Sequence, residues 1–334
     1  MTSPFQRKKI RWGVLGYARI ASESVIPALL RADNSELHAL ASRDQEKLAV
    51  ARTRYSIPTT YVGYEALLCD PEIDAVYIPL PNNQHREWTI RAAEHGKHVL
   101  CEKPLGLNAA EVRDMIAACS TNKVTLMEAF MYRYTDRIAK VRGVLRSGAL
   151  GEIKFVEATF RYPLDRPESI KWNPSLGGGS AYDVACYPIN LIGLIADTCA
   201  GKPGSGEIHP ESVSAECVRA GGIDVIFSGL MKYSSGLLAA VHSGFNAQKH
   251  VMAQIVGTKG ILDIPETYFD LAGSLTLSFG EERQEIPVTK SDRYRHEIED
   301  FADAILQGRP PACGLAETLR NAEVLDRLFA AAAK

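Results

Sequence analysis

The chain has 334 residues, of which 46% are hydrophobic and 23% are charged, as in ordinary globular proteins. At this length we expect about two domains, each with a core that needs no disulfide or metal for stability. The formal net charge of -2 argues against nucleic-acid binding, which relies on a strongly positive surface. We find no membrane-spanning apolar stretch and no signal-peptide core, so we expect a cytoplasmic protein.

Seven cysteines are present, at positions 69, 101, 119, 186, 199, 217 and 313. Their number is odd, and no two have the short spacing of a zinc knuckle or a redox dithiol, so we predict no metal site and no disulfide. Cys101 and Cys119 lie in apolar-rich segments, where a thiol usually acts as a small core residue. Reduced cysteines agree with a cytoplasmic location.

Strands and helices alternate in the first part of the chain. Short apolar runs predict strands at 10–15, 37–42, 75–78, 98–101 and 124–127. Helical patterns lie between them, and Asp44 and Asn108 are suited to cap two of the helices. Such alternation produces right-handed crossovers and a parallel sheet covered on both faces. The predicted fold class is therefore α/β, with a doubly wound Rossmann domain over residues 1–130.

The pattern changes in residues 131–334, for which we predict an α+β domain that binds substrate and mediates oligomerisation. Alternating polar and apolar residues predict strands at 153–162, 211–219, 224–232 and 237–242. These strands indicate a large, mostly antiparallel sheet, interrupted by a helix near 186–196. We expect the last two helical segments, 295–306 and 316–333, to pack back on the first domain.

A glycine-containing turn, Gly16-Tyr-Ala-Arg-Ile-Ala21, separates the first predicted strand from the first helix. The dinucleotide fingerprint G-x-G-x-x-G/A places glycines there for a tight turn and for close approach of a pyrophosphate to the helix N-terminus. Ala18 replaces the second glycine, so the motif alone is weak evidence. Its place in the first βαβ unit favours a dinucleotide site.

The second predicted strand ends with Ser42, followed by Arg43 and Asp44. An acid at this position holds the ribose 2′-hydroxyl of NAD, whereas an arginine accommodates the 2′-phosphate of NADP. Ser42 and Arg43 favour NADP. NAD stays open, because Asp44 is an acid, although helix capping explains Asp44 without any ligand.

Three motifs further along resemble one family. They are Leu100-Cys-Glu-Lys-Pro-Leu105, Leu80-Pro-Asn-Asn-Gln-His85, and Gly177-Gly-Gly-Ser-Ala-Tyr-Asp183-Val-Ala-Cys-Tyr187-Pro. In this order they resemble the Glu-Lys-Pro, Thr-Pro-x-x-x-His and Gly-Gly-Gly-x-x-x-Asp segments of the glucose–fructose oxidoreductase (Gfo/Idh/MocA) family, with Leu80 in place of threonine. Trp172-Asn173 resembles the family's Trp-Arg pair, and Tyr294 with Glu297 resembles its late cofactor-side segment. Tyr187, in place of a common histidine, is similar to the dihydrodiol and D-xylose dehydrogenase branch.

The resemblance, together with the glycine turn, implies an NAD(P)-dependent oxidoreductase acting on a sugar, polyol or dihydrodiol. The glycine turn, the end of the second strand and the resemblance together predict these cofactor contacts: Gly16, Ala18, Arg19, Ile20, Ser42, Arg43, Pro81, Asn82, His85, Glu102, Lys103, Trp172 and Tyr294. His85 is the weaker case, since it could equally cap the next helix. The family also implies a homo-oligomer, a dimer or a tetramer, that pairs through the open face of the C-terminal sheet.

Hydride transfer between a carbinol and nicotinamide needs an acid/base group at the oxygen. A free tyrosine, with a pKa near 10, is a poor base, but a neighbouring ammonium group lowers that pKa. Our hypothesis is that Tyr187 exchanges the proton and that Lys103 orients the substrate and tunes the tyrosine. Asp183 would bond to a substrate hydroxyl or hold Lys103.

Asp183, Tyr187 and Asn190 have i, i+4, i+7 spacing, which predicts one helix face. Because Pro188 is comfortable only in a first turn, that helix should begin near Asp183. Arg133 and Tyr162 are weaker substrate-side candidates, which a solvated charge and a core aromatic explain as well. Two alternatives stay open for the whole chain: a dinucleotide-binding sensor without turnover, and an enzyme that never releases its NADP.

Overall fold

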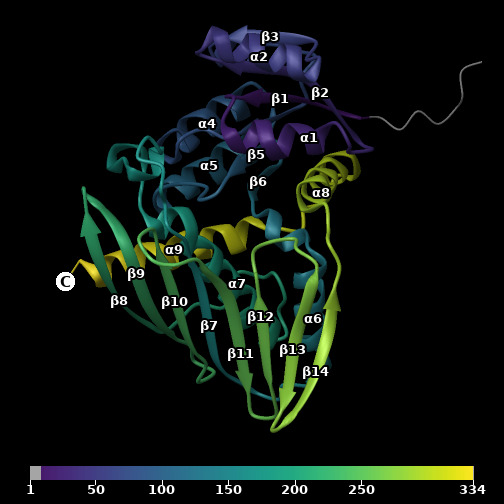
Figure 1. The fold of residues 1–334 in the computed structure, drawn as a ribbon. Coiled ribbons are helices and arrows are strands. Elements are labelled where there is room, and N and C mark those ends of the chain that lie inside the picture. Colours follow the sequence, from purple (N-terminus) through teal and green to yellow (C-terminus); the bar gives the residue numbers. More distant parts are fainter. Residues whose placement is uncertain (1–8, 334) are drawn as a thin grey trace, which may run out of the picture. The chain divides into compact units, whose positions relative to one another are not determined.

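The structure, a computed structural model, describes residues 9–333 and divides the chain into two compact units (Figure 1). The first unit comprises the chain up to Leu105, Arg113–Ala129 and Asp292–Ala312. The second comprises Gly106–Val112, Phe130–Ser291 and the chain from Cys313 onward. The main division thus falls between Ala129 and Phe130.

The first unit contains a six-stranded sheet in which all neighbouring strands run parallel. Its strands, in the spatial order β3-β2-β1-β4-β5-β6, are Thr59–Val62, Ser35–Ser42, Ile10–Leu15, Ala75–Ile78, His98–Glu102 and Leu126–Ala129. The order reverses between β1 and β4, and ligands of open α/β sheets bind at the strand ends beside such a point. The predicted doubly wound Rossmann fold is confirmed.

Short helices join these strands. They are η1 (Ala21–Val25), α1 (Ile26–Leu29), α2 (Gln45–Tyr55), α3 (Glu65–Leu68), η2 (Asn82–Gln84), α4 (His85–Glu94) and α5 (Ala109–Thr121). The two predicted caps are confirmed, since Asp44 accepts the Glu46 amide at 3.0 Å and Asn108 accepts the Glu111 amide at 2.9 Å. A late helix, α8 (Arg293–Gln307), also belongs to this unit, where Arg31 bonds to Asp292 at 2.8 Å.

The second unit contains an eight-stranded sheet in the order β14-β13-β12-β11-β7-β10-β9-β8. In that order the strands are Glu282–Val288, Gly273–Phe279, Ile261–Pro265, His250–Gly257, Ile153–Arg161, Leu238–Gly244, Ile223–Lys232 and Ser212–Ala220. β10 pairs with β7 in parallel, and the other neighbours are antiparallel. The prediction of a mostly antiparallel sheet is confirmed.

The helical segments of this unit are η3 (Met131–Tyr134), α6 (Asp136–Ser147), η4 (Ile170–Trp172), η5 (Pro174–Leu176), η6 (Ala181–Ala185), α7 (Cys186–Cys199) and α9 (Leu315–Ala332). We expected α9 to pack on the first domain, but the structure groups it with the second unit. Buried ion pairs explain this difference. Arg320 of α9 lies 2.6 Å from Asp197 of α7, and Glu317 lies 3.1 Å from Arg133.

The cysteines and the helices bear on two further expectations. Cys101 and Cys119 are buried core residues, as predicted. The seven cysteines, all within residues 9–333, form no disulfide with one another. None of the helices within residues 9–333 is both long and apolar enough to cross a membrane.

Candidate active site

The turn after β1 has the backbone geometry that the dinucleotide fingerprint requires. Gly16 has a φ of +108°, a left-handed conformation in which a side chain is strained. A Cβ atom there would also lie 3.0 Å from Cδ2 of Leu80. The helical segment begins at once, since the carbonyl of Ala18 accepts the Ser22 amide at 3.0 Å. The turn therefore fits a pyrophosphate, and contacts from Ala18, Arg19 and Ile20 stay predictions.

The end of β2 favours a 2′-phosphate over a ribose hydroxyl. Asp44, the acid that NAD would need, uses its Oδ1 to cap α2, accepting the Lys47 amide at 3.1 Å. Ser42 is buried, and its Oγ accepts the Asp44 amide at 3.1 Å. Arg43 is exposed, and no salt bridge joins it to a carboxylate within residues 9–333. Arg43 is thus the cation at this strand end that an anionic ligand can reach.

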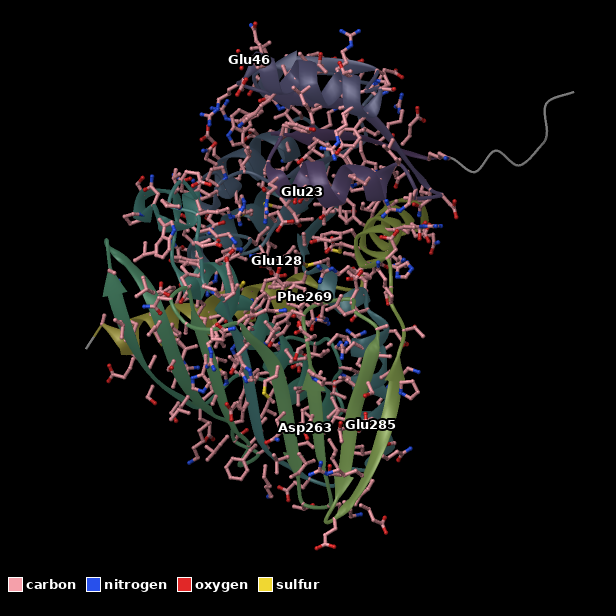
Figure 2. The ribbon with its side chains drawn as sticks, viewed as in Figure 1. Glu23, Glu46, Glu128, Asp263, Phe269 and Glu285 are labelled. Carbon is pink, nitrogen blue, oxygen red and sulfur yellow. The ribbon has the colours of Figure 1, made fainter. Side chains whose placement is uncertain are left out.

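The loop that carries Lys103 is held on both sides of the lysine. On one side, the hydroxyl of Tyr77 donates to Oε1 of Glu102 at 2.7 Å. On the other, the carbonyl of Pro104 contacts the ring of His85 at 2.9 Å. The amide of Leu105 donates at 2.9 Å to Glu128, which is labelled in Figure 2. A solvated surface lysine needs no such support. The hydrogen bonds on both sides of Lys103 therefore indicate that the fold holds the backbone of this lysine in one position.

The ring of His85 lies between two loops of the first unit. Its ring is fully buried, and Nδ1 and Nε2 contact the carbonyls of Pro104 and Leu80 at 2.9 and 2.8 Å. The ring joins the loops after β4 and β5, and its contact with a cofactor stays a prediction. Burial lowers the pKa of His85, and the contacts with the backbone carbonyls oppose this shift. Pro81 and Asn82, in the loop before η2, stay predicted contacts.

Glu102 belongs to a buried group of acids and phenols behind the lysine loop. Burial chiefly, and the charge of Glu102 next, raise the pKa of Glu297 on α8 well above its ordinary value. Oε1 of Glu297 has no hydrogen-bond partner among the described residues. Tyr294 lies in the same group, and burial chiefly raises its pKa to about 12. This places Tyr294 beside Glu102, and its contact with a cofactor stays a prediction.

In the second unit, Tyr187 stands in an aromatic enclosure near the start of α7. Its ring centroid lies 5.4–5.7 Å from those of Phe130, Tyr132, Phe160 and Tyr268. The hydroxyl donates to Sδ of Met131 at 3.5 Å, a weak acceptor. The tyrosine is 4% exposed, so packing fixes the ring and the enclosure supplies the low-dielectric surroundings in which a nearby charge acts strongly.

Asp183 is bound by a lysine that the sequence analysis did not single out. Its Oδ2 accepts from Nζ of Lys171 at 2.7 Å and from the hydroxyl of Tyr162 at 2.8 Å. Lys171 also donates to that hydroxyl at 2.8 Å, so Tyr162 accepts from the lysine and donates to the acid. The three groups are a closed cluster that fixes the Asp183 carboxylate. Tyr162, a weak candidate from sequence, is thereby tied to the site.

The glycine triplet explains why Lys171 reaches Asp183. The amides of Gly178 and Gly179 donate to the carbonyls of Asn173 and Lys171, each at 3.0 Å. A Cβ atom at Gly178 would lie 2.5 Å from the Lys171 carbonyl, so only glycine permits this approach. The glycine triplet thus positions Lys171. The one sequence signal for Lys171 was that it directly precedes Trp172.

The remaining candidates have structural partners. Arg133 is buried against Glu317 at 3.1 Å and donates to Oδ1 of Asn190 at 3.1 Å, so it is neither solvated nor open to substrate. Nε1 of Trp172 donates to the carbonyl of Arg166 at 3.0 Å, and its predicted cofactor contact stays a prediction. The helix begins before Asp183, as a π-helical turn over Ala181–Ala185 that continues into α7.

Each unit therefore assembles one part of the predicted site. The first holds the glycine turn, Arg43 and Lys103, and the second holds Asp183 and Tyr187. The pairing of Lys103 with Tyr187 stays a prediction.

Comparison with known families agrees with this division. Residues 10–130 match the model of an oxidoreductase family with an NAD-binding Rossmann fold (GFO_IDH_MocA). Residues 138–263 match the GFO/IDH/MocA C-terminal domain.

Full-length relatives are enzymes by name. The chain is 36% identical to D-xylose 1-dehydrogenase (NADP(+)) 2 of Haloferax volcanii, covering 96% of this chain and 97% of that one. It is 31% identical to a trans-1,2-dihydrobenzene-1,2-diol dehydrogenase of Xenopus tropicalis, covering 95% and 96%. A solved 3-ketoreductase of Actinomadura kijaniata, in complex with NADP and TDP-benzene, superposes with a TM-score of 0.88 at 27% identity over 97% and 98% of the two chains.

The buried acid Glu297 generates a prediction about stability and pH. Its pKa is raised in the folded state, so stability is fully present below the ordinary value of 4.5 and is lost as pH rises toward the folded value. Glu297→Gln removes the ionisation, so the variant should gain stability over the wild type as pH increases from about 5 to about 8. Melting temperatures measured across this range test it. Exposed Glu46→Gln is the control, and a variant that loses stability more steeply with pH than the wild type contradicts the prediction.

Proposed function

Because this chain belongs to the GFO/IDH/MocA oxidoreductase family, we propose that it transfers a hydride between NAD(P) and a CH–OH or C=O carbon of a sugar, polyol or dihydrodiol. The observation that carries the proposal is the support of the Lys103 loop by Tyr77, His85 and Glu128. The relatives named as a xylose dehydrogenase and a dihydrodiol dehydrogenase support the substrate class.

We propose NADP as the cofactor, since the exposed Arg43 stands at the β2 end while Asp44 is used as a cap. The similar D-xylose 1-dehydrogenase is named for NADP(+), and the solved 3-ketoreductase is in complex with NADP, which supports the same assignment. When bound, the nicotinamide accepts or supplies the hydride. The chain's own residues have the tasks of binding, orientation and proton transfer.

In the oxidation direction, the substrate hydroxyl gives its proton to Oη of Tyr187 while the carbinol carbon loses its hydrogen as hydride. In the reverse direction, Tyr187 returns that proton to the reduced oxygen. The ammonium of Lys103 bonds to the same substrate oxygen and favours the phenolate of Tyr187. Asp183, fixed by Lys171 and Tyr162, accepts a substrate hydroxyl and so orients the sugar.

Tyr187→Phe tests the proton transfer. The variant should lower kcat by about 10²–10⁴-fold, the usual contribution of a positioned acid/base group, with unchanged affinity for NADPH. The measurement is a spectrophotometric assay with D-xylose, other sugars, polyols and a trans-dihydrodiol, using both cofactors. Buried Tyr233→Phe is the matched control.

Near-normal turnover by Tyr187→Phe contradicts this role and makes Lys103 the better proton donor. NADPH binding by the wild type without turnover of any substrate in the panel indicates a sensor instead. A nucleotide that remains bound through purification indicates an enzyme with resident NADP.

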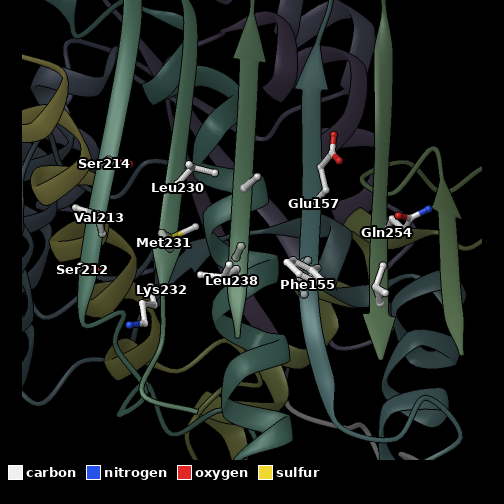
Figure 3. A pocket seen from close by; sticks show the side chains of 14 residues that line it. Phe155, Glu157, Ser212, Val213, Ser214, Leu230, Met231, Lys232, Leu238 and Gln254 are labelled. Atoms are coloured by element: carbon white, nitrogen blue, oxygen red, sulfur yellow. The ribbon is translucent and has the colours of Figure 1, made fainter. Parts of the chain in front are cut away.

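The partner proposed for this chain, besides substrate, is a second copy of itself. The outer face of the eight-stranded sheet has a groove of about 560 Å³ whose lining includes Phe155, Leu230 and Leu238 (Figure 3). These side chains are 53%, 59% and 45% exposed. Large exposed apolar patches of this kind mark interaction surfaces. We also propose a cytoplasmic location, which agrees with seven cysteines that form no disulfide with one another.

Leu230→Glu tests the oligomer, because a carboxylate on this face opposes burial against another apolar surface. Light scattering should give the mass of a dimer or tetramer for the wild type and a smaller mass for the variant. Glu216→Gln on the neighbouring strand β8 is the control. A monomeric wild type, or a variant with the wild-type mass, contradicts the proposal.

A further inference from the structure

A groove of about 630 Å³ lies beside Arg43 in the first unit. It is formed where β2 and β3 end and where α4 begins, and its lining includes Arg43, Tyr64, Gln84, Trp88 and Arg91. All of these elements meet at the carboxyl edge of the parallel sheet. In dinucleotide-binding folds the adenosine half of the cofactor lies toward the end of the second strand, which reads the ribose. The groove therefore occupies the adenosine side of the proposed cofactor site.

Aromatic and cationic side chains contact one another in series along this groove. Cζ of Arg43 lies 6.0 Å from the ring centroid of Tyr64. The rings of Tyr64 and Trp88 meet edge to face, with centroids 4.9 Å apart and an interplanar angle of 84°. Cζ of Arg91 lies 5.0 Å from the ring centroid of Trp88. We call Arg43, Tyr64, Trp88 and Arg91 the cation–aromatic series.

The series begins at the glycine turn. The hydroxyl of Tyr64 lies 3.8 Å from the point that a Cβ atom of Gly16 would occupy. Tyr64 is 7% exposed, so its ring is a fixed support rather than a surface group. Trp88 is partly exposed and lines the groove. The indole is therefore the aromatic surface of the series that a ligand can contact.

The two arginines differ in their partners. Arg91 is bound by two carboxylates, Glu65 at 3.0 Å and Glu87 at 3.1 Å. Its charge is compensated, and its guanidinium serves to hold the Trp88 ring. Arg43 makes no salt bridge with any residue in the described range 9–333. Of the two, Arg43 is the cation suited to a phosphate.

We propose that Trp88 is the wall on which the adenine ring of the cofactor packs, that Arg91 positions this wall, and that Arg43 binds the 2′-phosphate. The inference rests on the proposed function and extends it, since no role was assigned to Tyr64, Trp88 or Arg91. Adenine has a flat π-face that stacks on aromatic side chains, as bases do in nucleic-acid complexes. The Trp88 wall contributes equally to the binding of NADPH and of NADH, whereas Arg43 favours NADPH.

The test uses isothermal titration of the full chain with NADPH, NADH, AMP and adenosine 2′,5′-bisphosphate. Trp88→Ala should weaken the binding of all four by about 10-fold, leaving the ratio of NADPH to NADH affinity unchanged. Trp88→Phe keeps an aromatic face and should stay within about 3-fold of the wild type. Arg43→Ala should weaken NADPH and the bisphosphate by about 10-fold or more, with little effect on NADH and AMP. Arg52→Ala, an exposed arginine on α2, is the matched control.

Tryptophan fluorescence gives a second readout that needs no catalysis. Adenosine 2′,5′-bisphosphate should quench Trp88 emission, and the quench should disappear in Trp88→Phe, in which Trp12 and Trp172 remain. Arg91→Ala should reduce both the quench and the affinity. Arg86→Ala, on the same helix and paired with Asp114 at the surface, should change neither.

Three results distinguish a failure of the proposed function from a failure of the inference about Trp88. If the wild type binds neither NADPH nor NADH, the proposed function and this inference are both overturned. If the wild type binds NADPH and Trp88→Ala binds it equally well, the inference alone is overturned. If Trp88→Ala unfolds, as judged by its melting curve, Trp88→Phe and the fluorescence quench decide, and an unchanged quench in Trp88→Phe overturns the inference.

Discussion

The parallel pairing of the six strands in the first unit is the constraint on which most of the site depends. Because all strands point the same way, the loops that follow them meet at one edge. The segments that follow β1 to β5 in turn supply Gly16, Arg43, Tyr64, His85 (the first residue of α4) and Lys103. Residues spread over about a quarter of the chain thus lie along one edge of the sheet, because the parallel strand order alone brings them there. The adenosine groove and the lysine loop both lie along this edge.

In the second unit, the site depends on aromatic packing around one side chain and on hydrogen bonds that fix another. Tyr187 is enclosed by rings, and Asp183 is fixed by Lys171 and Tyr162. A carboxylate held by two donors keeps one orientation, so it needs no reorganisation when a substrate hydroxyl arrives. The glycine triplet contributes through its backbone, by bringing Lys171 within reach of the acid. The glycine triplet therefore acts on the site indirectly, through Lys171, which lies outside the triplet.

Local chemistry allowed both sheets, the helix caps at Asp44 and Asn108 and the buried Cys101 to be predicted from the sequence. Tertiary pairing accounts for the rest. The packing of α9 depends on buried ion pairs such as Arg320 with Asp197, whose partners lie far apart in the chain. The contacts of the His85 ring with the carbonyls of Leu80 and Pro104 also depend on how the loops after β4 and β5 fold, which no motif in the sequence shows. Lys171 carried no motif of its own, and its role follows from the fold of the glycine loop.

The central claim is that Lys103, in the first unit, and Tyr187, in the second, act as one acid/base unit. The most direct test is a double-mutant cycle on the single-turnover rate of NADPH oxidation, with Lys103→Met, Tyr187→Phe and the double variant, using the best substrate of the panel. Residues that act as a unit are strongly non-additive. The account predicts that the double variant is about as slow as the slower single variant. Losses that multiply would show that the two residues act independently, and would contradict it.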